Sequence, residues 1–367
     1  LLLLDLGPGV FETATVDTNI IQIEKNINQD KLKASTINVG ESIPFLDDSD
    51  FVNLNSTSIE NWIILTPQEQ NIKHRAELIG TPLKDWDIDI NSGIKTGYNE
   101  AFIIDTEKRN ELISLNIENK KIIKPLLRGK DLKKYYSEFK ELWLLFIPWH
   151  FPLHLNKNIT GNSILAENAF QTQFTDIYNH LGEYKDKLSK RNKEETGIRY
   201  EWYALQRCAN SYFEDFEKDK IIYSEISQEP SFYLDLNKMY IGNTAYILVG
   251  DNLKYLLALL NSSFVTYIFS NFYSTKLGQK GYRYLAQYMD KLPIPKIQDK
   301  EQIPFEILAD KIIEKKVKEE DTKELEDEVD LMVYKLYELS FDEVLVIDRE
   351  FKMSEAVYNN YKIRNID

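Results

Sequence analysis

Residues of the types that carry out catalysis are few, and their spacing does not let them act together. The chain has 1 cysteine and 4 histidines. His150 and His154 are four residues apart, but Pro152 between them excludes a regular helix that would offer both rings to one metal ion. Cys208 has no histidine nearby in the sequence to activate its thiol. We therefore assign no catalytic or metal-binding role to these residues.

Patterns typical of methyl transfer and of DNA cleavage are also incomplete. Residues 5–9, Asp-Leu-Gly-Pro-Gly, imitate the glycine loop of an S-adenosylmethionine site, but that loop precedes a helix, and residues 10–23 have the composition of a strand. A site that methylates a flipped adenine needs an Asn/Asp-Pro-Pro-aromatic motif, and the sequence contains no Pro-Pro pair. The Glu-X-Lys triplets at 118–120 and 183–185 follow no positioned aspartate on a strand. We expect no catalytic residue in the chain.

Residues suited to binding nucleic acid are more numerous. In residues 92–104, Ser-Gly-Ile-Lys-Thr-Gly-Tyr-Asn-Glu-Ala-Phe-Ile-Ile, two glycines bracket polar residues and an apolar run follows, which predicts a tight loop that leads into a buried strand. Arginine can bind guanine through two hydrogen bonds, asparagine or glutamine can bind adenine in the same way, and lysine binds phosphate. These rules select as candidate DNA-binding residues Lys95, Thr96, Tyr98, Asn99, Arg128, Lys130, Lys190, Arg191, Arg199, Gln206, Arg207, Lys276, Gln279, Lys280 and Arg283. Taken singly, each is better explained as a solvated surface residue, and only the whole set indicates DNA binding.

The composition indicates a folded protein in which charge is unevenly distributed. The chain has 367 residues, 43% of them hydrophobic, and a net charge of −14. Residues 91–300 carry 29 Lys and Arg against 25 Asp and Glu, a net charge of +4, whereas residues 1–90 and 301–367 each have a net charge of −9. A positive centre between acidic flanks favours a polyanionic partner. The single cysteine and the lack of an apolar run of transmembrane length predict a cytoplasmic location.

Caps and periodicity predict the elements that would position these residues. Thr66-Pro67-Gln68-Glu69 combines an N-cap, a proline at the first helical position and a capping box, which predicts a helix that ends at Gly80. Strands are expected at 86–90, 142–146, 220–223 and 245–249, helices over 170–191 and the apolar stretch 251–272, and an extended segment at 292–295. Residues 122–131 form an apolar segment that ends in a charged turn. The pattern predicts an α+β fold, in which a mixed-sheet recognition domain with a buried helix precedes an acidic helical C-terminal segment. The apolar stripe of that segment, which should pack on the rest of the protein, consists of Leu325, Val329, Met332, Val333 and Leu336.

Five segments in a fixed order resemble one known family. Residues 93–102, Gly-Ile-Lys-Thr-Gly-Tyr-Asn-Glu-Ala-Phe, resemble the opening signature of the target-recognition domain in TaqI-like adenine-specific DNA methyltransferases, a domain that type IIG restriction-modification enzymes share. Segments 123–131, 220–223, 255–262 and 292–295 match in the expected order. Residues 10–21 resemble the last strands of the catalytic domain of such an enzyme. The chain begins without Met and lacks the family's cofactor-binding and base-flipping motifs, so we expect it to be the C-terminal portion of a longer enzyme.

The resemblance implies a domain organisation and a function. Residues 1–35 would be the last strands of the methyltransferase domain, 36–90 a connector with one helix, 91–297 the DNA target-recognition domain, and 298–367 a helical C-terminal segment. The chain would recognise a specific sequence of double-stranded DNA for a bifunctional enzyme that methylates adenine N6 and cleaves DNA. Its partners would be that DNA and the upstream methyltransferase and nuclease domains of the same polypeptide. No cofactor is expected in this chain, whereas the parent enzyme would use S-adenosylmethionine and, with a nuclease, Mg²⁺.

Two alternatives remain open at this point. The chain could be the recognition part of a phage-defence adenine methyltransferase that has no nuclease. It could also be a methyltransferase by itself that binds S-adenosylmethionine through residues 7–9. Binding of S-adenosylmethionine to this chain would favour the second alternative, whereas the first differs from the main hypothesis only in the nuclease.

Overall fold

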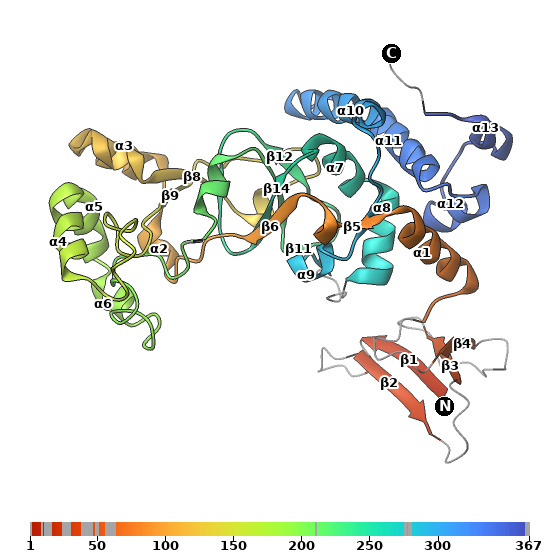
Figure 1. The fold of residues 1–367 in the computed structure, drawn as a ribbon, viewed down its shortest axis with the longest axis horizontal. Coiled ribbons are helices and arrows are strands. Elements are labelled where there is room, and N and C mark those ends of the chain that lie inside the picture. Colours follow the sequence, from red (N-terminus) through yellow and green to blue (C-terminus); the bar gives the residue numbers. More distant parts are fainter. Residues whose placement is uncertain are drawn as a thin grey trace.

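The computed structural model describes residues 2–8, 10, 17–23, 31–37, 47, 51–55, 64–209, 211–274, 277 and 281–363. Its fold is α+β, as the sequence predicts, with several small sheets and a helical C-terminal segment. The molecule is elongated: the helices within residues 106–189 occupy one end, two sheets the middle, and the C-terminal helices the other end (Figure 1). The N-terminal strands lie to one side of this arrangement (Figure 1).

The N-terminal strands form a sheet of their own. They are β1 (Leu2–Pro8), β2 (Asp17–Gln22), β3 (Lys31–Thr36) and β4 (Val52–Asn55), in the order β2-β1-β3-β4. β1 runs antiparallel to β2 and parallel to β3. Gly7 and Pro8 of the glycine motif pair with Thr18 and Asp17, so this part of the motif belongs to a strand. Gly9 and residues 11–16 lie outside the described residues.

Helix α1 (Pro67–Ile79) begins and ends where the sequence predicts. The Thr66 hydroxyl accepts a hydrogen bond from the Glu69 N–H, and the Glu69 carboxylate accepts one from the Thr66 N–H at 2.7 Å. After the helix, β5 (Thr81–Pro82) pairs with β16 (Pro293–Ile294), which confirms the extended segment expected at 292–295. A Cβ on Gly80 would lie 2.5 Å from the backbone of Pro293, so only glycine allows this approach.

The central sheet separates two hydrophobic cores. Its strands are β6 (Ile88–Ser92), β10 (Lys220–Ser224), β12 (Tyr233–Asp235) and β14 (Ala245–Gly250), antiparallel in the order β12-β10-β14-β6. Successive side chains of a strand point to opposite faces. Ile221 and Leu248 accordingly join the core that includes the C-terminal helices, whereas Ile222 and Ile247 join the other core. The strands expected at 220–223 and 245–249 are confirmed, and the one expected at 86–90 lies two residues later.

A second sheet supports the other core. It consists of β7 (Ile103–Ile104), β8 (Ile123–Leu127), β9 (Trp143–Leu145) and β13 (Tyr240–Ile241), in the order β13-β8-β9-β7. The strand expected at 142–146 is thereby confirmed, and the apolar segment that begins at residue 122 contains β8. The buried strand expected after the 92–98 loop is only partly correct, because α2 (Asn99–Phe102) precedes the two residues of β7. Helix α3 (Thr106–Leu115) follows, and 3-10 turns occupy Ile117–Lys121, Gly129–Asp131 and Phe213–Glu217.

The single helix expected over 170–191 is wrong. The structure has α4 (Ile164–Gln173), α5 (Thr175–Gly182) and α6 (Lys185–Ser189) in its place. Phe174 leaves the helical conformation, with φ −129° and ψ 48°, and its ring packs 5.2 Å from that of Phe151. Burial of this ring in the core therefore outweighs the helical periodicity of the sequence.

The helix expected over 251–272 is interrupted as well. It consists of α7 (Leu253–Leu260), α8 (Ser263–Ile268) and a π-helical turn (Phe269–Tyr273). The buried Asn261 side chain donates to the Phe232 carbonyl at 3.0 Å and accepts from the Phe232 N–H at 3.3 Å, and Ser262 caps α8. The burial expected for this stretch is confirmed. Within the described residues no single helix is long and apolar enough to cross a membrane, and the one helical pair of sufficient apolar length is bent by 64°.

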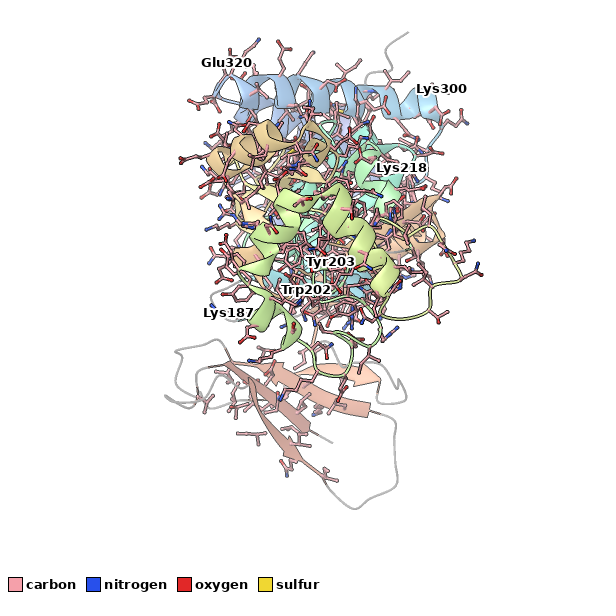
Figure 2. All side chains as sticks on the ribbon, turned by 90° about the vertical axis from the view of Figure 1, so that its left-hand side faces the viewer. Lys187, Trp202, Tyr203, Lys218, Lys300 and Glu320 are labelled. Carbon is pink, nitrogen blue, oxygen red and sulfur yellow. The ribbon has the colours of Figure 1, made fainter. Side chains whose placement is uncertain are left out.

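The C-terminal segment packs on this buried stretch. It contains α10 (Asp299–Val317), α11 (Lys323–Leu336), α12 (Phe341–Ile347) and α13 (Glu355–Asn360), and Figure 2 shows Lys300 near the start of α10. Val329, Met332 and Val333 of the predicted stripe are buried, and Leu325 and Leu336 pack against the same core. The predicted packing of the acidic tail on the protein is confirmed.

Candidate nucleic-acid interface

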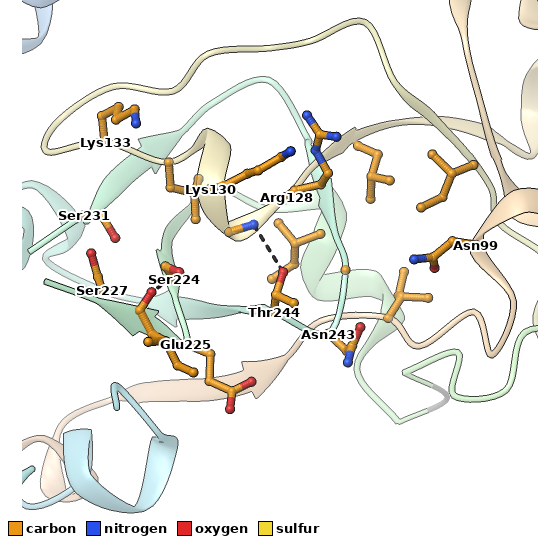
Figure 3. A pocket seen from close by; sticks show the side chains of 18 of the residues that line it. Asn99, Arg128, Lys130, Lys133, Ser224, Glu225, Ser227, Ser231, Asn243 and Thr244 are labelled. Carbon is orange, nitrogen blue, oxygen red and sulfur yellow. Dashed lines mark hydrogen bonds between the residues drawn. The ribbon is translucent and has the colours of Figure 1, made fainter. Parts of the chain in front are cut away.

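A cavity of about 850 Å³ opens between loops that adjoin strands of both sheets (Figure 3). Its lining comes mainly from residues 94–103, 126–134, 224–231 and 241–244. Four of the predicted DNA-binding residues, Thr96, Asn99, Arg128 and Lys130, line it. Segments far apart in the sequence therefore form one concave surface.

Two glycines allow these loops to approach each other. A Cβ on Gly93 would lie 2.1 Å from the carbonyl oxygen of Gly242, and a Cβ on Gly129 would lie 2.6 Å from that of Thr244. The Gly129 N–H also donates to the Thr244 hydroxyl at 3.3 Å. The turn at 242–244 is therefore held against both the 93–99 loop and the 128–131 turn.

Arg128 is fixed by a buried carboxylate. Its Nε donates to Asp131 Oδ2 at 2.8 Å and its Nη2 donates to Asp131 Oδ1 at 3.0 Å. Burial alone would raise the pKa of the Asp131 carboxyl, but the hydrogen bonds from Arg128 outweigh it and lower the pKa. The same hydrogen bonds raise the pKa of Arg128. The guanidinium is thus charged and held in one orientation at the wall of the cavity.

The basic turn after β8 supplies further cations. Lys130 is exposed and, with Lys133 and Lys134, lines the cavity. Lys134 forms an ion pair with Glu326 at 2.6 Å. Glu225 and Glu229 also line the cavity and partly offset these charges.

The loop at 93–99 is shaped by its own side chains. Gly97 has φ +80°, a conformation that favours glycine. The buried Thr96 donates its hydroxyl proton to Asn99 Oδ1 at 2.6 Å, so Thr96 shapes the turn, while the exposed Asn99 still has its amide N–H groups to offer. The Tyr98 hydroxyl accepts a hydrogen bond from Lys187 at 2.7 Å.

Arg191 has a structural role. Its guanidinium donates to the carbonyl oxygens of Thr96, Leu188, Trp202 and Ala204. Burial lowers its pKa to about 10. These bonds join the 93–99 loop to residues 202–204, and Figure 2 shows Trp202 within the end of the molecule that carries α4–α6. We therefore assign Arg191 to the positioning of this loop instead of to contact with DNA.

Arg199 and Arg207 form a cluster beside the same loop. Both form ion pairs with Glu195, at 2.9 Å and 2.7 Å. The backbone N–H groups of Lys95 and Arg207 donate to each other's carbonyl oxygens at 3.0 Å and 2.9 Å, which brings the exposed Lys95 beside them. Gln206 also lies here, with Oε1 2.8 Å from where a Cβ on Gly97 would be.

The remaining candidates are more distant or lie outside the described residues. Arg283 is exposed on β15 (Tyr282–Arg283), which pairs with β11 (Ile226–Ser227) at the edge of the cavity. Lys190 is exposed and pairs with Asp186 at 3.3 Å. Lys276, Gln279 and Lys280 lie outside the described residues.

The sequence reasoning did not select several cavity residues. Lys133 and Lys134 extend the basic run that starts at Arg128, and this run was the signal that could have identified them. The exposed Asn243 and Thr244 lie in a short turn between β13 and β14, which no pattern in the sequence distinguishes from an ordinary turn. Their position at the cavity depends on the approach of this turn to the glycines at 93 and 129.

The contacts of His150, His154 and Cys208 are those of structural residues. The buried Glu201 carboxylate accepts from the His150 and Ser163 N–H groups at 2.8 Å and 3.0 Å and lies 2.9 Å from His150 Nδ1. His154 stacks on Phe151. Burial raises the pKa of the Cys208 thiol to about 11, which disfavours the thiolate needed by a nucleophile. Among the described residues no group of three or more His, Cys, Asp or Glu could hold a metal ion.

Comparison with known proteins relates this architecture to DNA methyltransferases and restriction-modification enzymes. Residues 124–294 match the model of the TaqI-like C-terminal specificity domain. Type II methyltransferase M.MjaIV of Methanocaldococcus jannaschii is 22% identical over 256 residues, which are 66% of this chain and 77% of the relative.

One solved structure shows a similar fold at low identity. The type IIL restriction-modification enzyme MmeI, solved in complex with DNA, matches 98% of this chain with a TM-score of 0.51 and 13% identity. This chain spans 44% of the length of the MmeI chain. The type IIG restriction endonuclease BpuSI gives a TM-score of 0.39 and 16% identity over 74% of this chain and 33% of its own. Over residues 124–294, the chain is therefore similar to the TaqI-like C-terminal specificity domains.

Proposed function

We propose that this chain is the sequence-specific double-stranded DNA recognition module of a restriction-modification enzyme. The observation that carries the proposal is the basic cavity, which lies largely within the specificity domain and is walled by Arg128, Lys130 and Lys133. Phosphate contacts would come from the lysines, which place the protein on DNA without reading its sequence.

Arg128 is the best placed residue to read a base. A guanidinium already fixed by Asp131 loses little conformational entropy when it binds, and a fixed donor fits only one arrangement of acceptors. Guanine offers two acceptors in the major groove that match arginine. Asn99 and Asn243 carry amides that suit adenine.

The enzyme to which this module belongs would methylate adenine N6 and cleave DNA in the cytoplasm. The names of the relatives support methyl transfer and restriction as its activities. S-adenosylmethionine would be the methyl donor and Mg²⁺ would serve cleavage, both bound outside this chain. A second candidate, a methyltransferase without a nuclease, is favoured by the relative that is named only as a type II methyltransferase. Digestion of unmethylated DNA by the whole enzyme separates the two candidates.

Selection from a library of randomised DNA duplexes tests recognition by the chain itself. The wild-type chain should enrich one short motif. R128K keeps the charge but loses the planar fork, so it should relax one position of the motif and cost about 1–3 kcal/mol of binding to the selected site.

Lysine variants provide the comparison. K130A should weaken binding to all sequences and reduce the salt slope by about 1. Lys300 lies on α10, away from the cavity, so K300A gives the same change of charge as a matched control and should leave the motif and affinity unchanged. Failure of the wild-type chain to bind duplex DNA at low salt would refute the proposal.

A further inference from the structure

Two arginines beside the cavity share one carboxylate. Arg207 Nη1 donates to Glu195 Oε2 at 2.7 Å and its Nη2 donates to Oε1 at 3.2 Å. Arg199 Nη1 donates to Glu195 Oε1 at 2.9 Å. The Asn192 amide donates to Oε2 at 2.6 Å, so Glu195 is itself held in place.

The exposure of these side chains shows which of them can meet a ligand. The Glu195 side chain is 13% exposed, whereas those of Arg199 and Arg207 are 59% and 52% exposed. The carboxylate therefore lies beneath two guanidiniums that face solvent. The hydrogen bond from Arg207 is the main cause that lowers the pKa of Glu195, so the carboxylate is ionised at neutral pH.

The cluster has a net positive charge and adjoins the cavity. Lys95, Arg199 and Arg207 carry three positive charges against the one negative charge of Glu195. Lys95 pairs through its backbone with Arg207, while its neighbours Ile94 and Thr96 line the cavity. The 93–99 loop thus joins the cluster to the cavity.

A contribution to folding stability does not explain why Glu195 pairs with both arginines. Ion pairs with exposed partners typically contribute little to stability, because water screens the charges and ordering the side chains costs entropy. A carboxylate at a surface that binds phosphate also weakens general attraction to DNA. Arg128 is held by Asp131 in the same manner. Each of the three arginines is therefore held by a carboxylate.

We propose that Glu195 is a positioning residue for DNA recognition: it fixes Arg199 and Arg207 in one geometry and disfavours DNA of the wrong sequence. The inference depends on the proposed function. A mobile arginine can follow phosphates on any duplex, whereas two guanidiniums fixed on one carboxylate fit one arrangement of acceptors. The carboxylate also removes one unit of positive charge that would otherwise bind DNA without regard to sequence.

E195Q tests this role, with E194Q as the matched control. Glu194 is exposed and adjacent in the sequence, so E194Q gives the same change of charge without touching either arginine's carboxylate partner. Affinity is measured by fluorescence anisotropy at several salt concentrations for a duplex of random sequence and for the motif selected by the wild-type chain. E195Q should bind the random duplex more tightly, with a salt slope steeper by about 0.9, and its ratio of specific to non-specific affinity should fall about tenfold.

R207K provides a second test that does not change the charge. It cannot form the paired hydrogen bonds, so its affinity ratio should fall while its salt slope stays that of the wild type. Thermal unfolding of each variant verifies that the chain is folded. E194Q should keep the wild-type ratio.

The outcomes separate the two proposals. If the wild-type chain binds no duplex, the proposed function is wrong. If the wild type selects a motif but E195Q and R207K keep its affinity ratio within twofold, the function stands and the role of Glu195 is wrong. A parallel loss of both affinities in E195Q at an unchanged ratio would also overturn it, because that result indicates structural support alone.

Discussion

At the scale of single residues, arginines take different roles according to the acceptors that their N–H groups contact. Arg191 donates only to backbone carbonyl oxygens and lies largely buried beneath the 93–99 loop. Arg207 donates to a carboxylate and stays half exposed. The sequence identifies both as candidate DNA-binding residues, but the acceptors come from other parts of the chain. Burial and partners, and not residue type, therefore decide which arginine can reach DNA.

Arg191 should contribute mainly to stability. R191A leaves several buried carbonyl groups without a donor, so it should lower the free energy of unfolding by about 2–4 kcal/mol. Urea unfolding followed by circular dichroism measures this change. K190A, at an exposed neighbour, should change the free energy by less than about 0.5 kcal/mol. Wild-type stability of R191A together with weakened DNA binding would contradict the structural role.

At the scale of elements, polar residues with distant partners divide the helices that periodicity alone would continue. Asn261 ends α7 where its side chain binds the backbone of Phe232. Helix α11 is attached to the basic turn in a comparable way, since Glu326 pairs with Lys134 at 2.6 Å and with Lys316 at 3.0 Å. The acidic tail thus holds the turn that carries three cavity lysines.

The Glu326 link should show as a pH dependence of stability. Burial would raise its pKa, but attraction by Lys134 and hydrogen bonds from Lys134, Thr322 and Lys316 outweigh it and lower the pKa to about 2. Because the folded pKa lies below the unfolded one, the contribution is complete above about pH 5 and is lost as pH falls toward 2. E326Q should therefore cost up to about 3 kcal/mol at pH 7, and progressively less below about pH 4.

Urea unfolding of E326Q and the wild type at pH 7, 5 and 3 measures that difference. Glu324 is exposed on the same helix, so E324Q is the matched control and should match the wild type at each pH. A difference between E326Q and the wild type that stayed constant from pH 7 to pH 3 would argue against an ionised Glu326 as the stabilising group.

At the scale of the whole molecule, the central sheet joins two cores, and the C-terminal helices belong to one of them. Tyr255 of α7 packs edge-to-face on Phe305 of α10 at 5.4 Å, and the Tyr337 hydroxyl donates to the Pro293 carbonyl at 2.6 Å. The described residues of the N-terminal sheet instead bury Leu3, Leu4 and Leu32 in small separate clusters. The two ends of the chain therefore differ in how much the central fold depends on them.

Truncation should reveal this difference. Removal of residues 298–367 exposes one face of α7 and α8, so the remaining chain should lose its cooperative thermal transition or aggregate. Removal of residues 1–63 leaves both main cores intact and should keep a cooperative transition within a few degrees of the full chain. Differential scanning calorimetry of the two variants measures both results. A cooperative transition in the C-terminal truncation would show that the tail is dispensable to the core.

The sequence by itself determined the features that depend on neighbouring residues. The capping box predicted the start of α1, β-branched and apolar runs predicted β10 and β14, and alternate prolines predicted the extended segment at 292–295. Ordered motifs also identified the specificity domain, and the list of candidate DNA-binding residues contained four that line the cavity. These signals are local, so they can be recognised without knowledge of the fold.

Only the tertiary structure decided which of the candidate residues act together. Lys95 meets Arg207, Gly129 meets Thr244 and Asn261 meets Phe232 through contacts between distant parts of the chain. Such contacts interrupt the two expected helices and place Lys133, Lys134 and Asn243 at the cavity. They also bury much of Arg191. The physical reason is that burial and hydrogen bonding between distant segments outweigh local propensity, and a sequence pattern does not show which segments will meet.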